Sequence, residues 1–127
     1  MFAQLQYTEL IDLSENNITE IQKQSFTDLY LTTINISYNS LSKIEPKSFV
    51  NCNNITLLDL SHNLLENIPR LAFDESTYAS ALDLSFNRFT NMSQIPLQNM
   101  TGIRVLNVSY IFIADIPKNT FPKLYEL

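Results

Sequence analysis

Nucleophilic catalysis needs a serine or cysteine beside a base, and this chain contains only one histidine and one cysteine. His62 has Ser61 and Ser85 as its candidate partners, but the sequence suggests no oxyanion site beside them. Cys52 is expected among buried apolar side chains on the opposite side of the fold, so no Cys–His pair is predicted. Gly102 is the sole glycine, which leaves the chain unable to build a phosphate-binding loop. These residues predict no enzyme, no cofactor and no small-molecule substrate.

Paired carboxylates are the other chemistry that the sequence offers. Asp59 and Asp83 lie 24 residues apart and are expected on adjacent strands of a repeating fold. Such a pair could raise the pKa of one carboxyl group or attract a cation such as calcium. Calcium takes about six to eight oxygen ligands, which is more than this pair supplies. We therefore expect a solvated acidic stripe and no metal site.

An internal repeat would position these residues. Four segments of the form Leu/Ile-Ser-x-Asn start at positions 13, 36, 60 and 84, and Val-Ser-Tyr-Ile starts at 108, so the steps are 23, 24, 24 and 24 residues. Alternating apolar residues, such as Leu58 and Leu60, indicate a short strand with one buried face. One unit cannot bury that face alone, whereas stacked units can, with parallel strands about 4.8 Å apart. A distal apolar column, expected to fill the far side of each coil, comprises Phe26, Phe49, Phe73, Leu97 and Phe121.

These columns match the pattern L-x-x-L-x-L-x-x-N-x-L followed by a distal Phe-x-x-Leu, so the chain resembles the leucine-rich repeat superfamily. At 24 residues, the units are similar to the typical class of animal extracellular proteins, including chaoptin-like arrays and the ectodomains of Toll-like receptors. The resemblance implies an α/β solenoid. Its parallel β-sheet would form the concave face, with loops or short helical turns on the convex side.

The repeat register predicts a single domain over residues 1–127. Residues 1–7, with Phe2 and Leu5, match the tail of a preceding repeat, and Leu127 matches the start of a next one. Polar caps normally close such arrays, and the animal extracellular members usually have Cys-rich caps. We therefore expect a fragment of a longer solenoid whose ends expose apolar surface and strand edges. The five repeats between are assigned to 8–30, 31–54, 55–78, 79–102 and 103–126.

Outward-facing strand positions should form the binding surface of such a solenoid. Aromatic side chains in one of the predicted columns are suitable interface anchors, although they could instead simply stack along the sheet. The candidate partner-binding residues are Glu15, Tyr38, His62, Phe86 and Tyr110 in that column, Asp12, Asp59 and Asp83 in an acidic column, and Arg104 at the edge. The acidic column also contains Asn35 and Asn107, the edge column Glu9, Thr32, Thr56 and Ser80, and a further outward column Ser14, Ser37, Ser61, Ser85 and Ser109.

A ladder of asparagines accounts for the lack of glycine in the turns. A buried amide can satisfy backbone groups where the chain leaves each strand. We interpret Asn16, Asn39, Asn63 and Asn87 as structural residues and not as ligands of a partner. Ile111 replaces the asparagine in the fifth repeat, so a backbone group there should lose its partner at a cost of about 1–3 kcal/mol. That repeat is either locally irregular or, with its apolar run 110–113, a contact surface.

Six Asn-x-Ser/Thr sequons bear on the compartment. Asn54, Asn91 and Asn99 lie in connecting segments and are the primary candidates for N-glycosylation. Asn35 and Asn107 arise from the repeat template and Asn17 adjoins the ladder, so these three are secondary candidates. The sequons, with the animal-type repeat, predict an extracellular or cell-surface location.

Composition favours another protein as the binding partner, and a second copy of the same chain is one option. The net charge of −5 argues against nucleic acid, whose phosphates need a basic surface, and no apolar run reaches the roughly 20 residues that span a bilayer. The favoured function is a protein–protein interaction module of a cell-surface adhesion protein or receptor ectodomain. The alternatives are an intracellular scaffold or adaptor and a secreted matrix binder.

Overall fold

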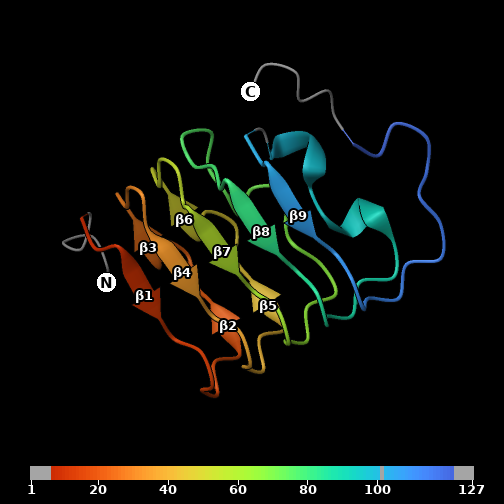
Figure 1. The fold of residues 1–127 in the computed structure, drawn as a ribbon, viewed down its shortest axis with the longest axis horizontal. Helices are drawn as coiled ribbons and strands as arrows, with labels where there is room; N and C mark the ends of the chain where they lie inside the picture. Colours follow the sequence, from red (N-terminus) through yellow and green to blue (C-terminus); the bar gives the residue numbers. More distant parts are fainter. Residues whose placement is uncertain (1–6, 101, 122–127) are drawn as a thin grey trace.

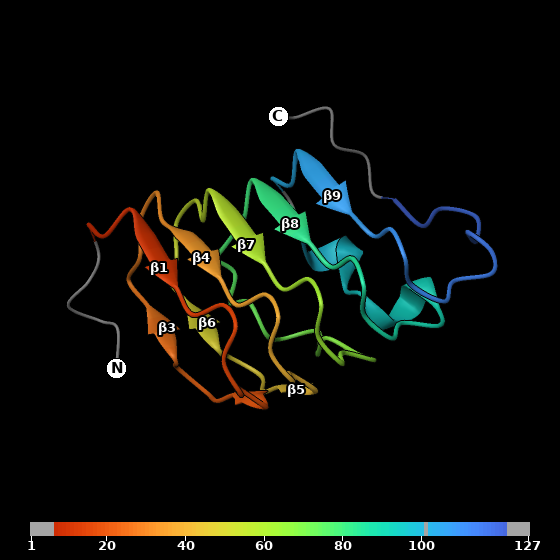
Figure 2. The ribbon, with the colours of Figure 1, turned by 60° about the horizontal axis from the view of Figure 1, so that its bottom comes forward.

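Five short parallel strands form the main sheet of the computed structural model, which describes residues 7–100 and 102–121. They stand side by side in the order β1-β4-β7-β8-β9 (Figures 1 and 2). Each strand contributes one turn of the predicted solenoid. Phe2, Leu5 and Leu127, which carry the predictions about flanking repeats, lie outside the described residues. The strands are β1 Leu10–Asp12, β4 Thr33–Asn35, β7 Leu57–Asp59, β8 Ala81–Asp83 and β9 Val105–Asn107.

The central residue of each strand points into the core. Ile34 pairs with Leu58 in the strand register, and both side chains are fully buried. Their neighbours on either side face outward, because successive side chains of a strand point to opposite faces. Burying an Ile or Leu side chain contributes about 1.5–3 kcal/mol, so the stacked central residues stabilise the solenoid rung by rung.

The opposite side of the solenoid begins with two small parallel sheets. One pairs β2 (Glu20–Ile21) with β5 (Lys43–Ile44), and the other pairs β3 (Phe26–Thr27) with β6 (Phe49–Val50). Figure 2 shows β3, β5 and β6 on the side away from the main sheet. The resemblance predicts loops or short helical turns here, whereas the first two repeats form strands. Their segments stay extended because the same positions pair from one repeat to the next.

The fourth repeat changes this pattern to two 3₁₀ helices, η1 (Met92–Gln94) and η2 (Leu97–Asn99). Asn91 caps η1 by accepting a hydrogen bond from the backbone N–H of Ser93. The side-chain oxygen of Gln94 in turn accepts a hydrogen bond from the backbone N–H of Asn91. This capping box, followed by Pro96, favours a helical turn over a paired strand. Within the described part of the chain, all helices are of this short 3₁₀ type, and none is long and apolar enough to cross a membrane.

Stacked phenylalanines fill the interior behind these segments. The rings of Phe26 and Phe49 lie 5.0 Å apart between centroids, and those of Phe49 and Phe73 also lie 5.0 Å apart. Leu97, the first residue of η2, continues the column in the fourth repeat and is buried. Phe121 is half exposed. The distal column therefore forms a continuous part of the core through the first four repeats.

Candidate functional site

A column of stacked rings lies where the strands of the main sheet end. Tyr38, His62, Phe86 and Tyr110 follow one another with centroid distances of 4.1, 4.1 and 4.4 Å, and adjacent rings are within 12° of parallel. We call these four residues the ring column. Tyr38, Phe86 and Tyr110 remain 55%, 41% and 74% exposed. The rings thus stack, as one interpretation predicts, and three of the four remain exposed to solvent. Glu15 occupies the same position one repeat earlier and is exposed.

The backbone of the ring column is left-handed at every rung. Tyr38, His62, Phe86 and Tyr110 have φ values between 52° and 55°, a region that side chains other than Gly and Asn seldom adopt. This conformation costs about 1–2 kcal/mol per residue. Backbone hydrogen bonds hold it in place, because the N–H of His62 donates to the carbonyl of Ser85 at 3.0 Å. Large aromatic side chains therefore occupy a turn position at which glycine would be less strained.

Next to the ring column, the last residue of each strand closes a local turn with the serine two places on. Asp59 Oδ1 accepts hydrogen bonds from the backbone N–H of Ser61 at 3.0 Å and from its hydroxyl at 2.6 Å. Asp83 makes the same pair of bonds with Ser85. Asp12, Asn35 and Asn107 repeat the arrangement with Ser14, Ser37 and Ser109. We call these five residues the Asx column.

The Asx column is electrostatically uncompensated. In residues 7–100 and 102–121 the one ion pair joins Lys43 to Glu45, on the opposite side of the solenoid. The hydroxyl and the backbone N–H of Ser14 hold the pKa of Asp12 below its ordinary value. Asp59 and Asp83 are direct partners in the register between β7 and β8. Three carboxylates thus lie along this face with no cation beside them among the described residues.

The serine column and part of the edge column lie elsewhere than the sequence analysis expects. Ser37, Ser61 and Ser85 are at most 5% exposed, whereas Ser14 is half-buried and Ser109 is exposed although both make the same hydrogen bonds to the Asx column. The three inner serines are therefore buried by the neighbouring repeats on either side. Thr32 is fully buried, and its hydroxyl donates to the carbonyl of Thr8. Arg104 remains exposed, as do Glu9 and Thr56, and Ser80 is half-buried.

One outward column was missed by the sequence analysis. It consists of the first residue of each strand, which lies on the same face as the Asx column because the two flank one inward residue. Leu10 and Val105 in this column are 56% and 60% exposed. Strict alternation around the inward residue of each strand would have found it. We call it the strand-start column, and its members are Leu10, Thr33, Leu57, Ala81 and Val105.

The asparagines behind this surface join one repeat to the next. Asn63 Nδ2 donates to the carbonyls of Ile36, Leu60 and Ser61, and its Oδ1 accepts from the N–H of Leu41 at 2.8 Å. Asn39 and Asn87 make the same set of bonds one repeat to either side. Asn16 has only the bonds to Leu13 and Ser14 within its own repeat.

The family match accords with this architecture. A family model described as leucine rich repeat matches residues 30–76, which cover β4, β7 and the asparagines Asn39 and Asn63. The chain contains leucine-rich repeats. No solved structure matches it. Leucine-rich repeat domains generally mediate protein–protein interactions, and their solenoids are typically non-enzymatic binding scaffolds.

The candidate base and nucleophiles, His62, Ser61 and Cys52, take part in the stacking, hydrogen bonds and core of the leucine-rich repeats. His62 is stacked between Tyr38 and Phe86, and the Ser61 hydroxyl donates to Asp59 and not to the imidazole. Cys52 is fully buried, and burial raises the pKa of its thiol to about 11. The described residues contain no group of three or more His, Cys, Asp or Glu that could hold a metal ion.

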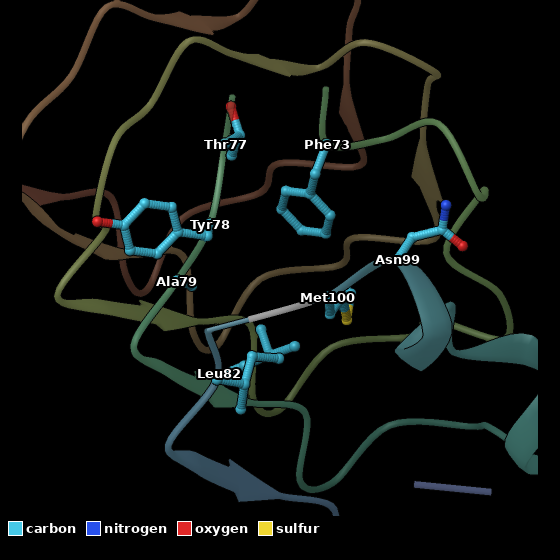
Figure 3. Close-up of a pocket in the computed structure, with 8 residues that line it drawn as sticks. Phe73, Thr77, Tyr78, Ala79, Leu82, Asn99 and Met100 are labelled. Atoms are coloured by element: carbon cyan, nitrogen blue, oxygen red, sulfur yellow. The ribbon is translucent and has the colours of Figure 1, made fainter. Parts of the chain in front are cut away.

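The cavity between the third and fourth leucine-rich repeats is too small to be a ligand site. Its volume is about 10 Å³, and Phe73, Tyr78, Leu82 and Met100 are among its lining residues (Figure 3). A cavity needs about 10–15 Å³ and several polar partners to hold a single water molecule. Two larger hollows, of about 670 and 680 Å³, are open to solvent on the opposite side of the solenoid. The candidate site is therefore an open surface and not an enclosed pocket.

The sequons differ in exposure. Asn91 and Asn99 are exposed on the 3₁₀ segment of the opposite side, and Asn17 is exposed beside the ladder. Asn54 is half-buried, and its Oδ1 accepts a hydrogen bond from the Ser80 hydroxyl at 2.6 Å. On the main sheet, Asn35 is half-buried and Asn107 is exposed, and both belong to the Asx column.

Proposed function

We propose that this chain is a protein-binding module whose contact surface is the outer face of the main sheet together with the ring column. The observation that carries the proposal is the stack of four aromatic residues, three of which are more than 40% exposed. Stacking also fixes the rings before a partner arrives, which lowers the entropy lost on binding. Exposed Tyr and Phe are favoured interface anchors.

We further propose that the module works outside the cell, in an adhesion protein or a receptor ectodomain of the animal extracellular class. Asn91 and Asn99 support this location, because both are exposed on the side opposite the proposed contact surface. Glycans at those two positions would leave the ring column open. The partner is a protein, and a second copy of the chain is one option.

The binding proposal is tested on an array of individually expressed ectodomains, with the chain itself included. The test variant carries Tyr38→Asn and Phe86→Asn, because asparagine tolerates the left-handed backbone of both positions. The matched control is Leu71→Asn, which removes a 58% exposed apolar side chain from the opposite side. We expect partners of the wild-type chain to be lost with the double variant and kept with the control. Partners that bind all three chains equally would overturn the proposal.

The compartment proposal is tested by mass spectrometry of the chain secreted from eukaryotic cells. We expect glycans at Asn91 and Asn99 and unmodified side chains at Asn35. A well-secreted chain that lacks glycans at every sequon would contradict the extracellular assignment. Glycans on Asn35 would instead cover the outer sheet face and contradict the proposed contact surface.

A further inference from the structure

The outer face of the main sheet consists of parallel columns of acidic and apolar side chains, and these columns restrict which partner can bind it. The acidic Asx column runs along its middle. The strand-start column lies on one side of it and the ring column on the other. Leu10 and Val105, on the two end strands, are more than half exposed in the first column, and Leu57 and Ala81 between them are half-buried. Tyr38 and Tyr110 are more than half exposed in the second. This surface is therefore complementary to a central row of cations flanked by two apolar rows.

The carboxylates of this face are pre-oriented for a cation. Each of Asp12, Asp59 and Asp83 uses Oδ1 to accept two hydrogen bonds from the following serine. No described residue donates a hydrogen bond to the second oxygen of any of the three, and no described cation pairs with them. The local turn fixes the side chain, so a partner cation would not have to order it.

The spacing of the rungs favours a helical partner. Neighbouring strands lie about 4.8 Å apart, so equivalent carboxylates recur at about that interval along the solenoid. One turn of an α-helix advances about 5.4 Å, and its side chains at i, i+4 and i+7 form one row. A helix lying along the solenoid can therefore place one side chain of a row over each successive rung. An extended strand repeats side chains on one face only about every 6.6 Å, which fits the rungs less well.

We propose that the partner contacts this face through an amphipathic helix whose central row is Arg or Lys and whose flanking rows are apolar. This inference rests on the proposed function and names the chemistry of the partner. The flanking rows would pack on the strand-start column and on the ring column. The central row would lie over Asp59 and Asp83, which are adjacent in the strand register.

The test uses three synthetic helical peptides and the whole chain, with affinity measured at low and physiological salt. The first peptide has an Arg row between two Leu rows, the second has Glu in place of Arg, and the third has the first composition in scrambled order. The chain is compared with its Asp59→Asn/Asp83→Asn variant. Asparagine already occupies the equivalent positions Asn35 and Asn107 and accepts the same serine hydrogen bonds, so this variant keeps the fold. The control is Glu66→Gln/Glu75→Gln, which removes two exposed charges from the opposite side.

We expect only the Arg-row peptide to bind. Its affinity should fall about three- to tenfold in the Asp59→Asn/Asp83→Asn variant, with a weaker salt dependence, and stay unchanged in the control. Equal binding of the Glu-row or scrambled peptide, or no effect of the aspartate variant, would overturn the helix proposal. If the ectodomain partners then still depend on Tyr38 and Phe86, the proposed function stands without it. If binding of the ectodomain partners depends neither on Tyr38 and Phe86 nor on Asp59 and Asp83, both proposals fail.

Discussion

The side-chain oxygen of Asn87 accepts a hydrogen bond from the backbone N–H of Leu65, one repeat earlier, at 2.9 Å. The amide of Asn87 also donates to the carbonyl of Leu60 in that earlier repeat at 2.9 Å. Both groups are buried, so water cannot replace the missing partner if the asparagine is lost. The bonds couple each repeat directly to its neighbour.

Replacing Asn87 with alanine should lower the free energy of unfolding by about 2–4 kcal/mol, because buried N–H and carbonyl groups lose their partners. Chemical denaturation followed by circular dichroism measures the change. The control is Asn16→Ala, because Asn16 is exposed and bonds only within its own repeat. The control should cost about 1 kcal/mol or less. Equal losses in the two variants would show that coupling between repeats does not depend on the ladder.

The fifth repeat interrupts the ladder, and the interruption can be repaired. Ile111 stands where an asparagine would accept a hydrogen bond from the backbone N–H of Phe89, and no described residue accepts one there. Ile111→Asn should raise the free energy of unfolding by about 1 kcal/mol, because the gain of a buried hydrogen bond exceeds the loss of a partly buried side chain. Ile111→Ala loses the same apolar contact without the new bond and should destabilise the protein. An asparagine variant as unstable as the alanine variant would contradict this account.

The left-handed backbone of the ring column predicts an unusual order of stability at Phe86. Phe86→Gly loses two stacked contacts but relieves the strain at φ 55°, so we expect a net cost of about 1 kcal/mol. Phe86→Val loses the same contacts and places a β-branched residue in the strained conformation, so its cost should be at least about 2 kcal/mol. Urea denaturation of both variants gives the comparison. A valine variant as stable as the glycine variant would show that strain is absent.

Cys52 should make stability fall with rising pH in the alkaline range. Burial raises the pKa of its thiol from 9.0 to about 11, so the unfolded chain loses its proton first as the pH rises. The folded protein should therefore lose stability between about pH 9 and pH 11, and the thiol should resist Ellman's reagent at pH 8 until the chain unfolds. Cys52→Ala removes this contribution to the pH dependence of stability. An identical pH profile in wild type and variant, or rapid labelling of the folded protein, would contradict the prediction.

Repetition made the solenoid and its core predictable. Five copies of one pattern fix which residue of each strand points inward, and Ile34 and Leu58 do so. The gap in the ladder at Ile111 also followed from the pattern, because one residue type was missing from a fixed position. The short strands on the opposite side did not follow, because two-residue elements such as β2 and β5 leave no periodic signal.

The outer surface was less predictable, because packing and hydrogen bonds between neighbouring repeats, and not hydrophobic alternation alone, decide which side chains are exposed. Serine is usually a surface residue, yet the hydroxyl of Ser61 donates a hydrogen bond to Asp59 and its side chain is buried. Thr32 is buried for a similar reason, since it bonds to the carbonyl of Thr8. The strand-start column was missed because its first and third members, Leu10 and Leu57, look like core residues in the sequence. Their outward orientation becomes clear only once the inward residue of each strand is fixed.

The unpartnered N–H of Phe89 also bears on how the molecule opens. In an array whose stability is a sum of repeat and interface contributions, the interface with the fewest bonds separates first. The fourth and fifth repeats meet at that interface, while asparagine side chains link each earlier pair of neighbours. Residues 105–121 should thus exchange their amide hydrogens through a small local opening, whereas the first four repeats exchange together as one cooperative unit. A sequence change at a single turn position thereby divides one continuous sheet into two folding units.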